Sequence, residues 1–300
     1  MLDFSKITTY PIKQRRNLVT RSDFTPVKND EELWVNAKVR DLVARIKWAR
    51  EKDRPVIMQM GAHVVKSGLS LLVIDLMKRG IVTHVAGNGA VSIHDFEMAL
   101  IGETSEDVGE SITDGSFGMA EETGGMMNDA INASPELGYG AAVGKMILDH
   151  GLKHPKYSIL AQGQKLGVPV TIHVAVGTDI IHQHPRCNGA NLGEATFQDF
   201  KIYCESIARA DDGVILNFGS AVIMPEVFLK ALSITRNLGH PVRPITTANF
   251  EIRRGLSNWY YRPTKNVVNR PTQDGGRGFN FLVDHKVSIP SLHRLLTKGE

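Results

Sequence analysis

The amino-acid sequence predicts an α/β protein in which one parallel sheet is covered by helices on both faces. Short apolar runs alternate with segments of helical spacing from residue 55 onward, and this order is typical of parallel sheets. Several of the apolar runs stop at a glycine, as buried parallel strands do where they turn into a helix. The 300 residues are 42% apolar and 22% charged, which is ordinary for one large folded domain.

The most informative stretch, Pro55–Asp95, has the pattern of a βαβ unit. Its two strands and its helix are expected at Val56–Met60, Ile81–Ala86 and Ser70–Lys78. Glycine turns follow both strands, at Gly61 and at Gly87-Asn88-Gly89-Ala90. Such turns let the backbone approach a ligand closely, and the N–H groups of the next helix favour a phosphate. The spacing differs from the GxGxxG fingerprint of dinucleotide-binding proteins. Two ordinary strand-to-helix turns without a ligand therefore explain the pattern equally well.

The regions flanking this unit are less regular. Residues 1–30 are polar and mixed and are expected to form an arm on the surface or on a partner subunit, outside a single domain at residues 31–300. An amphipathic helix is expected at Glu31–Lys52. Residues 101–145 are rich in glycine and acidic side chains and predict a long irregular segment, either functional or a solvated acidic loop.

The second half of the chain continues the alternation of strands and helices. Further strands are expected at 168–181 together with a turn, and at 213–218, 244–248 and 279–284. Further helices are expected at 135–150, 158–166, 197–210, 225–238 and 289–296. The strand at 213–218 ends at another turn of small residues, Gly219-Ser220-Ala221, and residues 251–278 form an irregular basic segment that includes Arg253 and Arg254.

Composition argues against several classes of protein. A formal charge of +3 and a pI near 8.8 are too mild to indicate nucleic acid as a partner. The sequence contains no 18-residue apolar run, so no membrane partner is expected, and no apolar core of a signal peptide is found near Met1. The two cysteines form no paired motif, which indicates a cytoplasmic location. His173, His182, His184 and Cys187 lie close in sequence but lack a proper ligand set, so no metal is predicted.

The order of these turns resembles the deoxyhypusine synthase family over most of residues 55–296. The resemblance implies a Rossmann-like sheet, NAD as cofactor, and a homotetramer with sites shared between subunits. Members of that family transfer an aminobutyl group from spermidine to a lysine. The positions that match the family's NAD contacts are Ala62, His63, Ser67, Asn88, Gly89, His94, Asp95, Gly219, Ser220, Thr247, Ala248 and Asp284. Among them, His94 replaces a family glutamate whose expected role is to bind the ribose of NAD. Asp284 matches a family aspartate near the adenosine end of NAD.

The sequence departs from the family where the chemistry takes place. The family's catalytic lysine position holds Pro271 beside Arg270, and a family histidine is replaced near Glu226. Two acids that hold spermidine in the family become Asn258 and Lys265. Fewer carboxylates and more cations disfavour a polyamine, so an anionic or carboxylate-bearing substrate suits the charge better.

The sequence therefore predicts an NAD-dependent enzyme that acts on a small amine-containing substrate other than the spermidine and lysine pair. Asp179 is expected to hold the substrate amine, and His182 or Glu226 to carry a proton. Lys265 is the candidate for an imine, and Lys66 is either a second candidate or a helix cap. Two alternatives are a true aminobutyl transferase and a non-catalytic sensor of NAD or a nucleotide.

Overall fold

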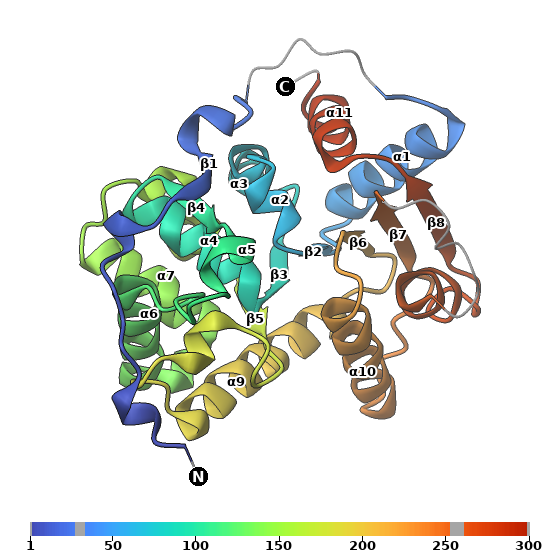
Figure 1. The fold of residues 1–300 in the computed structure, drawn as a ribbon. Helices are drawn as coiled ribbons and strands as arrows, with labels where there is room; N and C mark the ends of the chain where they lie inside the picture. Colours follow the sequence, from blue (N-terminus) through green and yellow to red (C-terminus); the bar gives the residue numbers. More distant parts are fainter. Residues whose placement is uncertain (1, 28–33, 253–260, 299–300) are drawn as a thin grey trace.

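A computed structural model describes residues 2–27, 34–252 and 261–298 and confirms the α/β architecture (Figure 1). Its centre is a six-stranded parallel sheet in the order β5-β3-β2-β6-β7-β8. In chain order these strands are β2 (Val56–Met60), β3 (His84–Asn88), β5 (Val170–His173), β6 (Val214–Phe218), β7 (Thr246–Glu251) and β8 (Arg277–Leu282). No helix in the described part of the chain has the length and apolarity to cross a membrane.

Helices cover both faces of the sheet, which is why β2 and β6 are buried along their whole length. On one face, α9 (Gly189–Ala208) and α10 (Ile223–Asn237) pack over alternate strand residues such as Ile57 and Ile215. The opposite face packs against α1 (Ala37–Glu51), α3 (Ser70–Lys78), α8 (Ile159–Leu166) and α11 (His285–Thr297). The remaining helices of the described ranges include α2 (His63–Lys66), α4 (Gly89–Leu100) and the short η6 (Ile180–Gln183).

The connections divide the sheet between β2 and β6. From β2 the chain moves outward through β3 to β5, then crosses back and moves outward the other way through β6, β7 and β8. Ligands of doubly wound sheets bind at such a reversal, beyond the carboxyl ends of the strands. At this edge Met60 lies beside Phe218, and the Gly61 N–H donates to the Phe218 carbonyl at 2.9 Å.

The prediction of a long irregular segment at 101–145 is wrong. The structure has β4 (Glu103–Glu106), α5 (Val108–Ser111) and α6 (Glu121–Ala133) there, and α7 (Tyr139–Asp149) confirms the helix predicted at 135–150. Several glycines of this region lie inside helices and allow close packing, whereas others, such as Gly115 and Gly118, have positive φ in turns. A Cβ at Gly140 would overlap the Val170 carbonyl oxygen, and a Cβ at Gly144 would lie 2.7 Å from the Leu160 carbonyl oxygen.

Several predicted boundaries also move. In the described residues α1 begins at Ala37, where the Asn36 side chain accepts from Val39 N, and α9 begins at Gly189 behind the cap of Asn188. Strand β7 continues to Glu251 instead of ending at Ala248. The basic segment 251–278 holds the π-helical η7 (Thr264–Asn269), and α11 begins before its Pro290. Arg253, Arg254 and Asn258 lie outside the described residues.

The N-terminal arm packs against its own chain. Its strand β1 (Asn17–Thr20) pairs antiparallel with β4, and Tyr10 exchanges backbone hydrogen bonds with Met119 and Glu121. In Figure 1 the arm runs in dark blue along the outside of α6 and reaches β4. It therefore carries Arg15 to α4, although the two are far apart in sequence.

Candidate functional site

Two glycine turns meet where the sheet reverses. Gly61 follows β2 and Gly219 follows β6, and a Cβ on Gly61 would lie 2.8 Å from the Gly219 carbonyl oxygen. Gly219 has φ +70°, and a Cβ there would lie 2.5 Å from His285 Nε2. Only glycine suits both positions, because the backbones and the imidazole approach so closely. The turns predicted from the sequence are thus brought together at one point.

His285, the first residue of α11, is the most unusual polar group at this point. Its side chain is buried, and neither ring nitrogen has a hydrogen-bond partner among the described residues. The ring lies 5.9 Å from those of His63 and Phe218. Burial, and then the nearby His63, lower the pKa of His285 to about 4, so the ring is neutral at pH 7. A buried imidazole without partners indicates a group that a ligand or water satisfies.

The residues that flank this point have small or already engaged side chains. Ala62 and His63 start α2, and Ser67 ends it with its N–H bonded to the His63 carbonyl. The Ser220 hydroxyl accepts from Met224 N at 3.2 Å. Asp284 is exposed and accepts from Lys286 N at 2.8 Å as the N-cap of α11.

A pocket of about 220 Å³ opens beside the N-terminal end of α4, next to β3. Its walls come from the arm, α2, α4, the β4–α5 region and the segment before η6. They are formed by Arg15, Lys66, Ala90, Ile93, His94, Glu97, Ser105, Glu106, Val108, Phe117, Thr178, Asp179 and Ile180. Ser105 has φ +72°, a strained conformation of the kind that gathers at functional sites.

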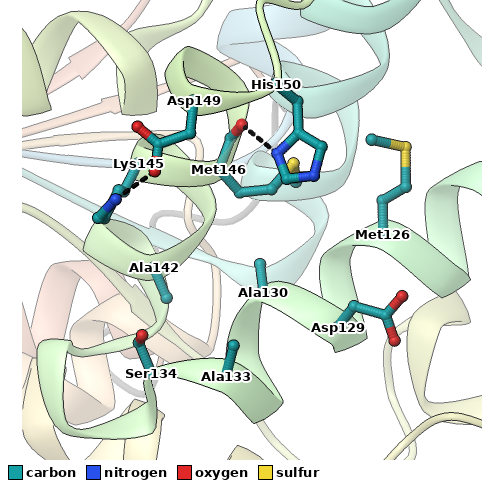
Figure 2. A pocket seen from close by; sticks show the side chains of 10 residues that line it. All are labelled: Met126, Asp129, Ala130, Ala133, Ser134, Ala142, Lys145, Met146, Asp149 and His150. Atoms are coloured by element: carbon teal, nitrogen blue, oxygen red, sulfur yellow. Dashed lines mark hydrogen bonds and ion pairs between the residues drawn. The ribbon is translucent and has the colours of Figure 1, made fainter.

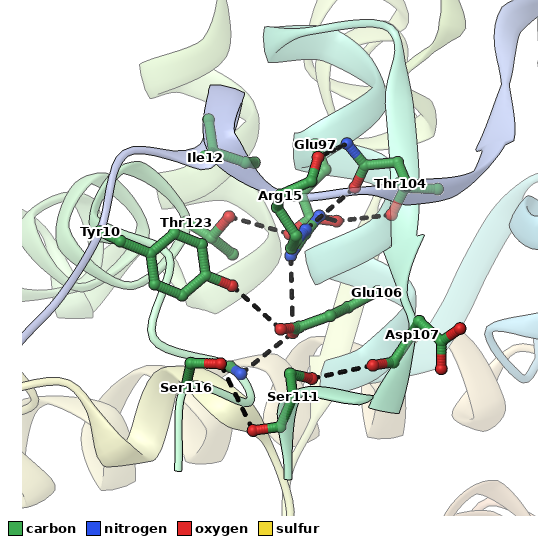
Figure 3. A network of polar contacts seen from close by, with 12 residues as sticks. Tyr10, Ile12, Arg15, Glu97, Thr104, Glu106, Asp107, Ser111, Ser116 and Thr123 are labelled. Atoms are coloured by element: carbon green, nitrogen blue, oxygen red, sulfur yellow. Dashed lines mark hydrogen bonds and ion pairs between the residues drawn. The ribbon is translucent and has the colours of Figure 1, made fainter. Parts of the chain in front are cut away.

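Most charges in this pocket are paired within the chain (Figure 3). The Arg15 guanidinium contacts Glu97 at 2.7 Å and Glu106 at 4.0 Å, and all three side chains are nearly inaccessible to solvent. Glu106 also accepts from the Tyr10 hydroxyl at 2.9 Å. Thr123 donates to the other carboxylate oxygen of Glu97 at 2.9 Å. Each charged side chain of this cluster therefore has an oppositely charged partner within the chain.

His94 joins the same cluster through a hydroxyl. Thr104 Oγ1 donates to Glu97 at 2.6 Å, so it accepts from His94 Nδ1–H at 2.7 Å. The other nitrogen of His94, Nε2, is then the unprotonated one. Burial lowers the pKa of His94 to about 4, which keeps it neutral at pH 7. A side chain predicted as a ribose ligand is thus also suited to accept a proton.

Asp179 differs from the other acids of the pocket. Its Oδ2 is buried and has no hydrogen-bond partner among the described residues, and burial raises the pKa of this carboxyl to about 6. The carboxyl lies over the start of α4, where a Cβ on Gly89 would overlap it. His182 Nδ1 accepts from Gly177 N and Asp179 N, so its proton is on Nε2, 3.8 Å from Asp179 Oδ2. Asn88, the last residue of β3, has an unpartnered buried Oδ1.

Three predicted cofactor residues have structural positions instead. The buried Asp95 carboxylate accepts from Ser158 Oγ, Ile159 N and Leu160 N and thereby caps α8. Thr247 and Ala248 lie inside β7, level with the middle of β6 and away from the carboxyl edge of the sheet. The predicted strand ends three residues before β7 does, since β7 reaches Glu251, and Thr247 Oγ1 is buried without a hydrogen-bond partner among the described residues.

Glu226 and Lys265 belong to a separate cluster. Glu226 lies in the first turn of α10 and contacts Lys230, Arg262 at 3.3 Å and Asn266 at 2.9 Å. These partners, Lys230 first, lower the pKa of Glu226, which makes it a poor proton donor at neutral pH. Lys265 is on η7, and neither side chain lines the pocket beside α4.

A larger pocket of about 360 Å³ lies between α6 and α7, away from the sheet edge (Figure 2). Alanines and Met126 and Met146 line much of it. Its charged residues have partners, because Lys145 pairs with Asp149 and Asp129 pairs with Arg186. In the described ranges no three His, Cys, Asp or Glu side chains gather to hold a metal ion.

Sequence reasoning missed several residues of the site. Arg15 and Glu97 carried no motif, and their pairing depends on the path of the arm. His285 follows Asp284 directly, but nothing in the sequence indicates that its ring reaches Gly219. An unusual conformation at Ser105 has no sequence signature either.

Comparisons with known proteins show the fold. No family model and no curated protein matches the sequence. Among solved structures, AgrE in complex with ornithine and NAD+ superposes with a TM-score of 0.53 at 14% identity over 87% of this chain. A conserved LOR/SDH-type protein from Methanococcus maripaludis S2 gives 0.51 at 16% identity, covering 90% of this chain and 71% of its own. A candidate deoxyhypusine synthase from Entamoeba histolytica gives 0.50 at 12% identity and covers 86% of both chains.

The fold is therefore similar to those of deoxyhypusine synthase-like proteins, as the sequence resemblance indicated, and of LOR/SDH-like proteins, which the sequence did not indicate. This chain spans only 32% of the length of AgrE. At these identities the likeness extends to the fold and not to a substrate.

Proposed function

We propose that the protein is an NAD-dependent enzyme that acts on a small amine-containing substrate. The observation that carries this proposal is the meeting of Gly61 and Gly219 at the reversal of the sheet, beneath an imidazole whose nitrogens have no partner. Dinucleotides bind at this position in doubly wound sheets. NAD bound to AgrE, a protein of similar fold, supports the same cofactor here.

The residues at the reversal fit the diphosphate part of NAD. The turn glycines donate their own N–H groups to the Phe218 and Phe250 carbonyls and leave the backbone open to close approach, and His285 has an N–H without a partner among the described residues that can donate to a phosphate oxygen. His63 and Ser220 lie beside the same turns. The pocket beside α4, at about 220 Å³, is smaller than the roughly 300–1,000 Å³ of typical ligand sites and suits a small substrate.

The chemistry next to the cofactor would use the pocket's own polar groups. NAD supplies a hydride acceptor when it is bound. Asp179 Oδ2 is available to accept a hydrogen bond from a substrate ammonium. His94 Nε2 is placed by Thr104 to accept a proton, and His182 Nε2–H is available as a donor beside Asp179.

The first alternative, aminobutyl transfer to a lysine, has less support. Arg270, beside the position of the family's lysine, donates to Asn266 Oδ1 at 3.2 Å, and Pro271 has no amine. The second alternative, a sensor without turnover, shares the cofactor site and differs only in its reaction. A homotetramer with shared sites and a cytoplasmic location remain part of this proposal.

Calorimetric titration with NAD+ tests the cofactor site. We expect the wild-type protein to bind NAD+, and His285→Leu to weaken binding about tenfold, because one hydrogen bond to a charged group is lost. The matched control is His240→Leu, since His240 is an exposed histidine beyond α10. It should leave the affinity unchanged.

Absence of NAD+ binding by the wild-type protein would overturn the proposal. Equal binding by both variants would remove His285 from the site. Incubation with NAD+ and a panel of amines, followed by the absorbance of reduced nicotinamide, separates an enzyme from a sensor.

A further inference from the structure

Among the described residues, two charged groups in the pocket beside α4 lack a hydrogen bond to the atom that faces the pocket or an ion pair with a charged group, in contrast to the rest of its wall. Arg15, Glu97 and Glu106 pair with one another. His94 is hydrogen-bonded and neutral. Lys66 and Asp179 are the exceptions among the charged residues of the lining.

Lys66 is half-buried at the end of α2, and among the described residues no ion pair or hydrogen bond engages its ammonium. Asp179 is buried, with Oδ2 unpartnered. The two side chains line the same pocket but form no ion pair with each other. Burying the Asp179 charge without a hydrogen bond is unfavourable, and the half-buried Lys66 ammonium supplies an unused cation in the same pocket.

We propose that this pocket binds a small amino acid in its zwitterionic form, with the ligand carboxylate on Lys66 and an ammonium on Asp179. The proposal rests on the proposed function and names the class of its amine substrate. A single ligand with both charges satisfies both groups at once. A diamine would place a second cation near Lys66, and a dicarboxylate would place an anion near Asp179, and like charges repel.

The remaining wall suits an aliphatic chain between the two charges. Ile93, Val108, Phe117 and Ile180 supply apolar surface. A volume of about 220 Å³ limits the ligand to a small molecule. The Arg15 cluster belongs to the same wall, and its one formal negative charge is held by contacts to the guanidinium and to the Tyr10, Thr104 and Thr123 hydroxyls.

Three matched probes test this assignment by calorimetry without any turnover. L-ornithine carries both kinds of charge, putrescine is its counterpart without the carboxylate, and valerate its counterpart without the amines. We expect the wild-type protein to bind L-ornithine at least about tenfold more tightly than either of the others, because each charge-assisted hydrogen bond contributes about that factor.

Two variants identify the groups responsible. Lys66→Met should reduce the affinity for L-ornithine to that for putrescine, and Asp179→Asn should reduce it about tenfold. Lys78→Met is the control, because Lys78 is an exposed lysine at the end of α3 outside the pocket. Thermal melting should confirm that all three variants are folded.

Putrescine binding as tightly as L-ornithine, or an unchanged affinity in Lys66→Met, would overturn the assignment. NAD+ binding is measured separately. NAD+ binding without a preference for L-ornithine overturns this inference alone. L-ornithine binding without NAD+ binding supports the pocket and contradicts the cofactor proposal.

Discussion

Two groups of polar side chains in this protein lie close together but differ in how fully they are satisfied. In the Arg15 cluster, an arginine and two glutamates are buried as ion pairs, with hydroxyl donors on the remaining oxygens. At the carboxyl edge of the sheet, Asp179 and His285 have buried atoms without partners. Lys66 lines the same pocket as Asp179, and it is half-buried with no ion pair or hydrogen bond to its ammonium among the described residues.

The contrast separates stability from binding. A network of ion pairs and hydrogen bonds holds the arm, α4 and β4 together and has a partner within the chain for each of its charged side chains. Buried polar groups without hydrogen-bond partners lower the stability of the fold, and proteins keep such groups mainly where a ligand supplies the missing hydrogen bonds. Substitutions in the first group should therefore destabilise the fold, whereas substitutions in the second should spare it.

The largest effect is expected from Arg15→Met. Removing the guanidinium leaves Glu97 buried without its counter-charge, which should cost about 3–5 kcal/mol of unfolding free energy. Urea denaturation measures this loss. Lys6→Met, which breaks an exposed pair with Asp3, is the control and should leave the midpoint unchanged. A loss in Arg15→Met no greater than in the control would show that the cluster does not stabilise the fold.

A smaller effect on stability is expected from replacing His84, a buried histidine whose two ring nitrogens both have hydrogen-bond partners. His84 is buried between Ser206 and Thr171, and burial lowers its pKa from 6.5 to about 3. The unfolded chain binds this proton more readily, so stability is full above pH 6.5 and is lost as pH falls toward 3. In His84→Gln the decline should be shallower, by up to about 1.4 kcal/mol per pH unit. Parallel pH profiles of the two proteins would contradict this.

The smallest effect, and one of opposite sign, is expected from Asp179→Asn. Burial raises the pKa of Asp179 from 3.8 to about 6, so the folded state binds the proton more tightly and wild-type stability falls as pH rises through that window. The amide has no charge to bury. The variant should therefore gain about 1 kcal/mol at about pH 8 and nothing at about pH 4. Denaturation at both values measures it, and a loss at the higher pH would mean that Asp179 has a partner in the folded protein.

The same contrast between local and distant contacts explains which features of the structure could be predicted from the sequence. Strand β2 and helix α3 lie where the sequence places them, because an apolar run and a helical spacing are local patterns. The turns at Gly61 and Gly219 were visible for the same reason. The glycines of α6 and α7 contributed to the wrong prediction of an irregular segment at 101–145. Glycine permits both irregular backbone and close helix packing, and only the packing partners distinguish the two.

The sequence by itself determined the α/β class, most strand and helix positions and the set of glycine turns, since each depends on residues close together in the chain. The tertiary structure decided which polar groups are satisfied. It places the Asp95 carboxylate at the start of α8, pairs Arg15 with Glu97, and packs the His285 ring against Gly219. Among the described residues, it left Asp179 Oδ2 without a hydrogen bond and the Lys66 ammonium without an ion pair. Such choices depend on contacts between distant segments, and no local pattern encodes them.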